Sequence, residues 1–188
     1  MLIVMNYFTG EWYADNAIMC EYLRDMEVVS GTDRNKILYV TPSKGGSNLY
    51  GLTWRSWLSP TKTRTKTKHE KLWQTKLVDL YPQFADIAKE FRDLHFPSFK
   101  YSQIQINKNY PIPPHKDSKN IGWSVLCTFG DFTGGRTHIK LGKTTLIRDA
   151  TNAPVHFNGS RFEHWVEPYE GERYSLVFFH NMKKRPGS

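Results

Sequence analysis

The residues with the clearest metal-binding chemistry lie in the segment YPIPPHKDSKN, where His115 and Asp117 stand two positions apart. Alternate residues of an extended segment share a face, so this spacing can place an imidazole and a carboxylate side by side. One more imidazole would complete the two-histidine, one-carboxylate set that binds non-haem iron(II). His164 is the best third candidate, because it follows the glycine-containing turn FNGSRFE and begins a new strand. The alternative is that His115 and Asp117 are surface polar residues, as most such pairs are.

A second polar pair interrupts an otherwise apolar strand, GERYSLVFFH. In an extended chain Arg173 and Ser175 share one face with Val177 and Phe179. A buried guanidinium needs a partner, and a carboxylate bound through two hydrogen bonds is the natural one. The nearby acidic residues fall in the preceding turn, which favours the carboxylate of a ligand, with the Ser175 hydroxyl adding a hydrogen bond. The alternative is that Arg173 lies at the strand end and extends to water.

Together these residues resemble the signature of the Fe(II)/2-oxoglutarate-dependent dioxygenases. The segment GDFTGG, residues Gly130 to Gly135, resembles the turn that joins paired strands in the double-stranded β-helix fold of these enzymes. Within the superfamily, HKDSKNIGWSVLCTF is most similar to the TET/JBP group, which oxidises the 5-methyl group of pyrimidine bases. The resemblance covers about Tyr101 to His180.

The chain departs from related groups in ways that bear on its substrate. It lacks the cysteine-rich zinc-binding part of animal TET enzymes, so the resemblance implies a minimal catalytic core. AlkB-type repair enzymes carry a second arginine six positions after the first, where this chain has Phe179, and JmjC-type enzymes usually have His-x-Glu and a lysine. Prolyl-hydroxylase-like members share the His-Asp-His set and a basic residue, which leaves a protein substrate open.

The resemblance implies a role for each matching residue. Fe(II) would be held by His115, Asp117 and His164, and 2-oxoglutarate would chelate it with its far carboxylate on Arg173 and Ser175. Dioxygen would take the last position on the metal.

Asn120 matches the asparagine that contacts the base in TET enzymes, and an amide can both donate to and accept from a base. The equally weighted alternative is a turn asparagine before Gly122. A base in a duplex must be flipped out to reach a buried metal. The aromatic residues that could stack on such a base are Trp123, Phe132, Phe162 and Trp165.

A basic segment adds to the nucleic-acid interpretation. In SPTKTRTKTKH no acidic residue occurs, and its basic residues alternate with threonines: Lys62, Arg64, Lys66 and Lys68. Such residues can neutralise phosphates without reading sequence, and the net charge of +8 agrees with a polyanionic partner, DNA in the first place. The alternative is an ordinary solvated loop.

Length and composition predict one domain over residues 1–188. The two cysteines, Cys20 and Cys127, match no disulfide framework or zinc spacing. The apolar start is too short for a signal peptide or a membrane span. We therefore expect a soluble intracellular protein with no membrane partner, located in a nucleus or, if viral or bacterial, in the host cytoplasm.

Periodicity predicts helices at Asp15–Met26, Glu70–Leu80 and Pro82–His95, and a strand at Lys36–Val40. After Phe99 the chain becomes a series of short β-branched or aromatic runs separated by turns. The expected fold class is α+β, a double-stranded β-helix (jelly-roll, cupin-like) core with supporting N-terminal helices. Residues 1–100 would be mainly helical support with a basic loop at 60–69, and residues 101–180 the catalytic core.

The leading hypothesis is a dioxygenase that hydroxylates the methyl group of a 5-methylpyrimidine in DNA, 5-methylcytosine in the first place. The first alternative is the same chemistry on a protein side chain such as proline or lysine. The second is a catalytically inactive jelly-roll module that binds nucleic acid or sugar.

Overall fold

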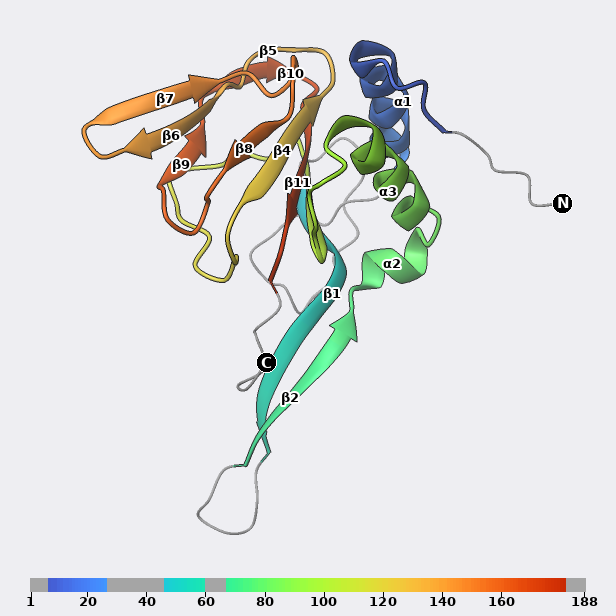
Figure 1. The fold of residues 1–188 in the computed structure, drawn as a ribbon, viewed down its shortest axis with the longest axis vertical. Helices are drawn as coiled ribbons and strands as arrows, with labels where there is room; N and C mark the ends of the chain where they lie inside the picture. Colours follow the sequence, from blue (N-terminus) through green and yellow to red (C-terminus); the bar gives the residue numbers. More distant parts are fainter. Residues whose placement is uncertain (1–6, 27–45, 60–66, 182–188) are drawn as a thin grey trace, which may run out of the picture.

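The structure is a computed structural model that describes residues 7–26, 46–59 and 67–181, with the backbone alone described for 52–59 and 67–73 (Figure 1). The elements, in chain order, are α1 (Trp12–Asp25), β1 (Gly46–Ser59), β2 (Thr67–Gln74), α2 (Lys76–Leu80), α3 (Phe84–His95), β3 (Gln103–Lys108), β4 (Ser124–Phe129), β5 (Phe132–Gly134), β6 (Thr137–Leu141), β7 (Thr144–Arg148), β8 (Val155–Phe157), β9 (His164–Val166), β10 (Tyr169–Gly171) and β11 (Tyr174–Phe179). The predicted strand Lys36–Val40 lies outside the described residues.

A six-stranded sheet in the order β2-β1-β3-β11-β4-β8 forms the centre of the molecule. Its strand pairings are antiparallel. The helices α1 and α3 cover one face of this sheet (Figure 1). The main hydrophobic core lies between them, where Leu23 and Phe91 of the helices pack with Ile106, Leu176 and Phe178 of the strands. This burial of large side chains on one side fixes which residues of each strand face the other side.

The opposite face of the large sheet packs against a three-stranded sheet in the order β7-β6-β9. A second, smaller core joins them, with Leu126 and Val177 from the large sheet and Ile139 from β6. Because side chains alternate along a strand, Val177, Ser175 and Arg173 all face this second core. A two-stranded ribbon of β5 and β10 lies next to these sheets (Figure 1).

The prediction for the C-terminal half agrees closely with these elements. Strands β3, β4, β6, β7, β8 and β11 lie in the region after Phe99 that the sequence predicts to be a series of short strands. The architecture is a mixed α and β fold with antiparallel sheets, as the α+β prediction requires. The helices predicted at Asp15–Met26 and Pro82–His95 are confirmed as α1 and α3.

The helix predicted over Glu70–Leu80 is wrong for most of its length. Residues up to Gln74 form strand β2, and only the short helix α2 follows. Strand β2 pairs with β1 along its whole length, from Ser59↔Thr67 to Leu52↔Gln74. These ladder hydrogen bonds come from the preceding strand β1, so the helical periodicity within residues 70–80 alone could not indicate them. The first hundred residues therefore contribute a long β ribbon as well as helices (Figure 1).

Candidate metal centre and donor cluster

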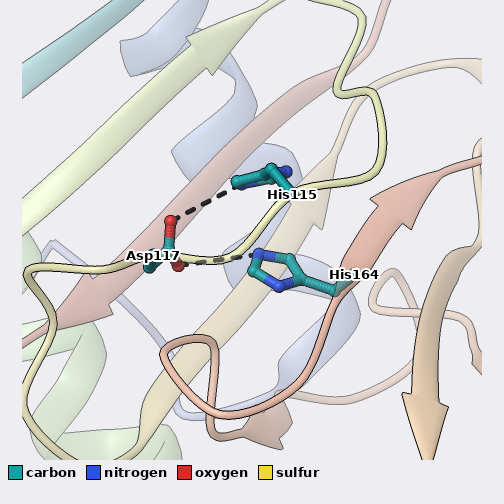
Figure 2. Close-up of side chains that lie close together, drawn as sticks. All are labelled: His115, Asp117 and His164. Atoms are coloured by element: carbon teal, nitrogen blue, oxygen red, sulfur yellow. Dashed lines mark ion pairs between the residues drawn. The ribbon is translucent and has the colours of Figure 1, made fainter.

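The structure brings His115, Asp117 and His164 together (Figure 2). One ligand atom from each lies within 4.8 Å of the others. Asp117 lies between the two rings: its Oδ1 is 3.5 Å from His115 Nε2, and its Oδ2 is 3.5 Å from His164 Nε2. Two imidazoles and one carboxylate at this spacing form a donor set that suits a non-haem Fe(II) ion.

Backbone contacts position the two histidines. The His115 N–H donates to the His164 carbonyl over 3.0 Å, and the His164 N–H donates back to the His115 carbonyl over 2.9 Å. This reciprocal bridge joins the loop after β3 to the start of β9. It holds the two rings with their centroids 4.3 Å apart.

Hydrogen bonds also determine which ring nitrogen of each histidine can bind a metal. His115 Nδ1 lies 2.8 Å from the Pro113 carbonyl, and His164 Nδ1 lies 3.1 Å from the Phe162 carbonyl. A carbonyl only accepts, so both Nδ1 atoms carry the proton. Both Nε2 atoms then offer a lone pair toward Asp117, as ligation requires.

The electrostatic environments of the two rings differ. Burial lowers the pKa of His164, whose ring is almost fully enclosed and therefore favours the neutral, ligating form. The hydrogen bond to Asp117 raises the pKa of the more exposed His115. Protons and a metal ion would therefore compete mainly at His115.

Gly159 lies next to two of the predicted metal ligands, Asp117 and His164. Its carbonyl accepts a hydrogen bond from the Asp117 N–H over 2.9 Å. A Cβ at Gly159 would lie 2.5 Å from Asp117 Oδ2 and 3.3 Å from His164 Cε1. The turn FNGSRFE therefore contributes a close backbone approach that only glycine allows.

Asn120 contacts the ligand carboxylate. Its Nδ2 donates to Asp117 Oδ2 over 3.1 Å, and its backbone N–H donates to the Asp117 carbonyl over 3.0 Å. The predicted substrate residue thus also orients a predicted metal ligand. In the described part of the chain its Oδ1 accepts no hydrogen bond, so it keeps an acceptor for another molecule.

Arg173 precedes β11 on the face that points to the second core. Only 2% of the residue is exposed, and its Nε and Nη2 have no hydrogen-bond partner among the described residues. The rings of Phe132 and Tyr169 lie 5.5 Å from its guanidinium carbon. Burial lowers the pKa of Arg173 to about 10. The alternative of a guanidinium extending to water does not hold, and an anion is the partner that would satisfy these donors.

Gly135 makes room for the guanidinium. A Cβ there would lie 3.0 Å from Arg173 Nε, and its φ of +68° is one that other residues rarely adopt. The second glycine of GDFTGG is thus required both by the turn and by the arginine.

Ser175 is fully buried two positions beyond Arg173, and its Oγ accepts a hydrogen bond from Asn107 Nδ2 over 3.0 Å. We call the Arg173 guanidinium and the Ser175 hydroxyl the donor cluster. The cluster and the metal centre border the same core, because Val177 follows Ser175 on this face and packs in the core with Phe157. The Phe157 ring in turn contacts the His164 ring at 4.8 Å.

Several buried polar residues were not among the predicted site residues. Ser124 and Thr137 are buried with hydroxyl oxygens that have no partner among the described residues. Asn107 is buried in β3. The alternation of polar residues in QIQIN was a signal for a polar inner face, but their partners depend on strand register.

The structure does not describe the side chains of the other predicted substrate residues. Lys62, Arg64 and Lys66 lie outside the described residues, and Lys68 lies in β2, where only the backbone is described. Their role in phosphate binding stays a prediction.

The four aromatic residues that could stack on a base differ in their contacts and exposure. Phe132 lies over Arg173, Phe162 packs against the second core, and Trp165 stacks on His138 at 5.1 Å. Trp123, in contrast, is 58% exposed. It follows the ligand loop directly, and is the one of the four most available to a substrate.

Ion pairs on the outer side of the small sheet support the strand that carries His164. Glu167 accepts hydrogen bonds from Arg136 Nε over 2.7 Å and pairs with His138 Nε2 at 2.9 Å. Arg136, and then His138, lower the pKa of Glu167 to about 2. These contacts connect β6 to the end of β9, beside the ligand.

Within the described ranges, no helix is both long and apolar enough to span a membrane.

No family model matches the chain, and no curated protein matches it in sequence. Among solved structures it is similar to NgTET1 in complex with 5mC DNA, with 17% identity, a TM-score of 0.49, and 72% of this chain and 60% of that chain covered. The chain thus spans less than two thirds of that protein. It is also similar to a Pseudomonas putida prolyl-4-hydroxylase, with 14% identity, a TM-score of 0.48, and 94% and 90% covered. A third is an oxidoreductase of the 2OG-Fe(II) oxygenase family from Burkholderia pseudomallei, with 19% identity, a TM-score of 0.41, and 73% of each chain covered.

Proposed function

We propose that the protein is an Fe(II)/2-oxoglutarate-dependent dioxygenase built on a double-stranded β-helix. One observation carries this proposal: a His-Asp-His ligand set borders the same small core as a buried arginine, two of whose nitrogens have no partner among the described residues. The ligand set fits a ferrous ion, and the arginine fits the far carboxylate of 2-oxoglutarate.

The residues of the chain have distinct tasks in this proposal. His115, Asp117 and His164 hold the metal and leave its other positions to 2-oxoglutarate and O2. Arg173 and Ser175 bind and orient the cosubstrate, and the rings of Phe132 and Tyr169 exclude water from the guanidinium. Together, iron, 2-oxoglutarate and O2 supply the oxidation of a substrate C–H bond to an alcohol.

For the substrate we propose the methyl group of a 5-methylpyrimidine, in the first place 5-methylcytosine in DNA. The similarity of HKDSKNIGWSVLCTF to the TET/JBP group supports this assignment. The ligand loop and the residue that follows it add chemistry suited to nucleic acid, since Lys116, Lys119 and Trp123 are all exposed. Lysines can neutralise phosphates, and an indole can stack on a base. The Oδ1 of Asn120, which has no partner among the described residues, can accept a hydrogen bond from an exocyclic amine.

The deciding experiment is mass spectrometry of nucleosides after the protein is incubated with methylated DNA, Fe(II), 2-oxoglutarate and O2. We expect oxidised 5-methylcytosine that depends on 2-oxoglutarate and is absent with Asp117→Ala. Trp123→Ala should raise KM for DNA, whereas Tyr13→Ala, an exposed aromatic on α1, should not. Succinate formed without any oxidised base would favour a protein substrate. No succinate under any condition would favour an inactive binding module.

A further inference from the structure

A chain of side-chain hydrogen bonds crosses three neighbouring strands and ends on Ser175. Gln105 Nε2 donates to Ser47 Oγ over 2.8 Å, and Ser47 Oγ donates to Asn107 Oδ1 over 2.6 Å. Asn107 Nδ2 then donates to Ser175 Oγ over 3.0 Å. The strand register supports this order, because Ser47 pairs with Asn107 and Asn107 pairs with Ser175.

The direction of the chain follows from the chemistry of the amide. A carboxamide oxygen only accepts and its nitrogen only donates. Because Ser47 gives its proton to Asn107 Oδ1, the Nδ2 of Asn107 must face Ser175. Ser175 Oγ therefore receives a hydrogen bond and keeps its own proton for another acceptor. No residue in the described part of the chain accepts that proton, and Ser175 is fully buried.

We propose that Asn107 is a positioning residue that makes Ser175 a hydrogen-bond donor, so that the donor cluster selects a carboxylate over a neutral amide. With the Asn107 amide fixed, the Ser175 hydroxyl and the unpartnered Arg173 nitrogens all offer protons. A ligand group that only accepts satisfies every one of them. A carboxamide would bring N–H groups against these donors and leave them unpaired. This inference rests on the proposed function, because the ligand is the far end of 2-oxoglutarate.

An aspartate at position 107 would have the same shape and the opposite hydrogen-bonding character. Both of its oxygens accept, so the Ser175 proton would turn toward position 107. Ser175 would then offer lone pairs to the ligand, which suits the N–H groups of an amide. Selectivity, rather than binding alone, is therefore the property that this residue should control.

The test compares two ligands on the full chain loaded with Mn(II): 2-oxoglutarate and its analogue with the far carboxylate converted to an amide. Isothermal calorimetry gives the ratio of the two Kd values. We expect Asn107→Asp to reduce the preference for 2-oxoglutarate by at least about tenfold, because a hydrogen bond to a charged group is lost and one to the amide is gained. Mn(II) affinity should not change, since the metal ligands are untouched.

A double-mutant cycle separates the hydroxyl from the added charge. Asn107→Asp also brings a negative charge near the ligand, and that effect would persist in a Ser175→Ala background. If Asn107 acts through the hydroxyl, the change in the ratio should be much smaller in that background. Ser47→Ala provides a second, uncharged variant: it frees Asn107 Oδ1, lets the amide turn over, and should lower the preference about threefold.

The outcomes are distinct. An unchanged Kd ratio in both Asn107→Asp and Ser47→Ala would overturn the inference, as would an equal change in the presence and absence of the Ser175 hydroxyl. If Asn107→Asp fails to fold, as judged by its melting curve, Ser47→Ala alone decides. Failure of the unchanged, Mn(II)-loaded protein to bind 2-oxoglutarate would overturn the proposed function, and this inference with it.

Discussion

The ligands of the metal centre are tied to backbone groups on several sides, whereas in the donor cluster two buried nitrogens of Arg173 have no partner among the described residues. His115 and His164 bind each other's backbone, and their Nδ1 atoms bind carbonyls. The rings of Phe132 and Tyr169 lie 5.5 Å from the guanidinium carbon of Arg173 and offer its Nε and Nη2 no hydrogen bond. The first arrangement is stable before a ligand arrives, while the second costs free energy until an anion binds. A substitution that removes the buried guanidinium should therefore stabilise the ligand-free protein, whereas one that disturbs the metal centre should destabilise it.

The largest effect is expected at the metal centre. Asp117→Ala removes the carboxylate that lies between the two imidazoles and should abolish both turnover and tight Co(II) binding, read from the visible spectrum of the cobalt-loaded protein. Ser118→Ala, on the same loop, is the matched control and should change neither. Retained turnover in the aspartate variant would refute the ligand assignment.

Replacing the buried cation should separate stability from binding. Arg173→Met should weaken 2-oxoglutarate binding by about 100-fold or more, because two charge-assisted hydrogen bonds are lost. In the ligand-free protein the same change should raise the free energy of unfolding by about 1–3 kcal/mol, because buried donors without partners disappear. Urea unfolding and calorimetry measure the two quantities. A loss of stability would show that the guanidinium is satisfied without a ligand.

Adding one methyl group next to the metal ligands should have the opposite effect on stability to the loss of the buried arginine. Gly159→Ala places a Cβ against Asp117 Oδ2 and should lower stability by about 1–3 kcal/mol while weakening metal binding. Affinity for 2-oxoglutarate should fall only as far as the metal is lost. Unaltered metal affinity would contradict the close approach of this turn.

A smaller effect is expected from the residue that orients the carboxylate. Asn120→Ala removes the hydrogen bond to Asp117 Oδ2 and should weaken metal binding by about tenfold. The binding of 2-oxoglutarate to the metal-saturated protein should be unchanged. If metal affinity stays constant and only KM for DNA rises, Asn120 acts on substrate alone.

The smallest effect is expected on the outer side of the small sheet. Glu167 has a lowered pKa in the folded protein, so its carboxylate stabilises the fold above its ordinary pKa, near pH 4. That contribution falls as the pH drops toward about 2. Glu167→Gln should slightly lower the melting temperature at pH 7, and the difference from the unchanged protein should vanish in acid. A constant difference across this range would exclude the ionised carboxylate as its cause.

Residue spacing indicated the site better than it indicated the fold around it. Residue type and short motifs were enough to identify the predicted site residues: His115, Asp117, His164, Arg173 and Ser175. Their proximity in space could not be identified in this way, because it depends on the bridge between two segments far apart in sequence.

The residues that sequence reasoning missed depend on strand register. Asn107 is one of several polar residues in β3, and only its pairing with both Ser47 and Ser175 distinguishes it. The ribbon of β1 and β2 was missed for a related reason, since the pairing of its strands outweighs the helical pattern of the second one. The division of the chain into a supporting first hundred residues and a catalytic region stays a prediction.

The reciprocal bridge between His115 and His164 has a thermodynamic consequence. A metal ion bound to both imidazoles would act as a reversible cross-link between two distant parts of the chain, closing a long loop in the way that a disulfide does. The concentration of free iron would then set how firmly that loop is closed. Chelation should accordingly expose the backbone amides of the His115 loop and of β9 to hydrogen exchange first, before the main core opens.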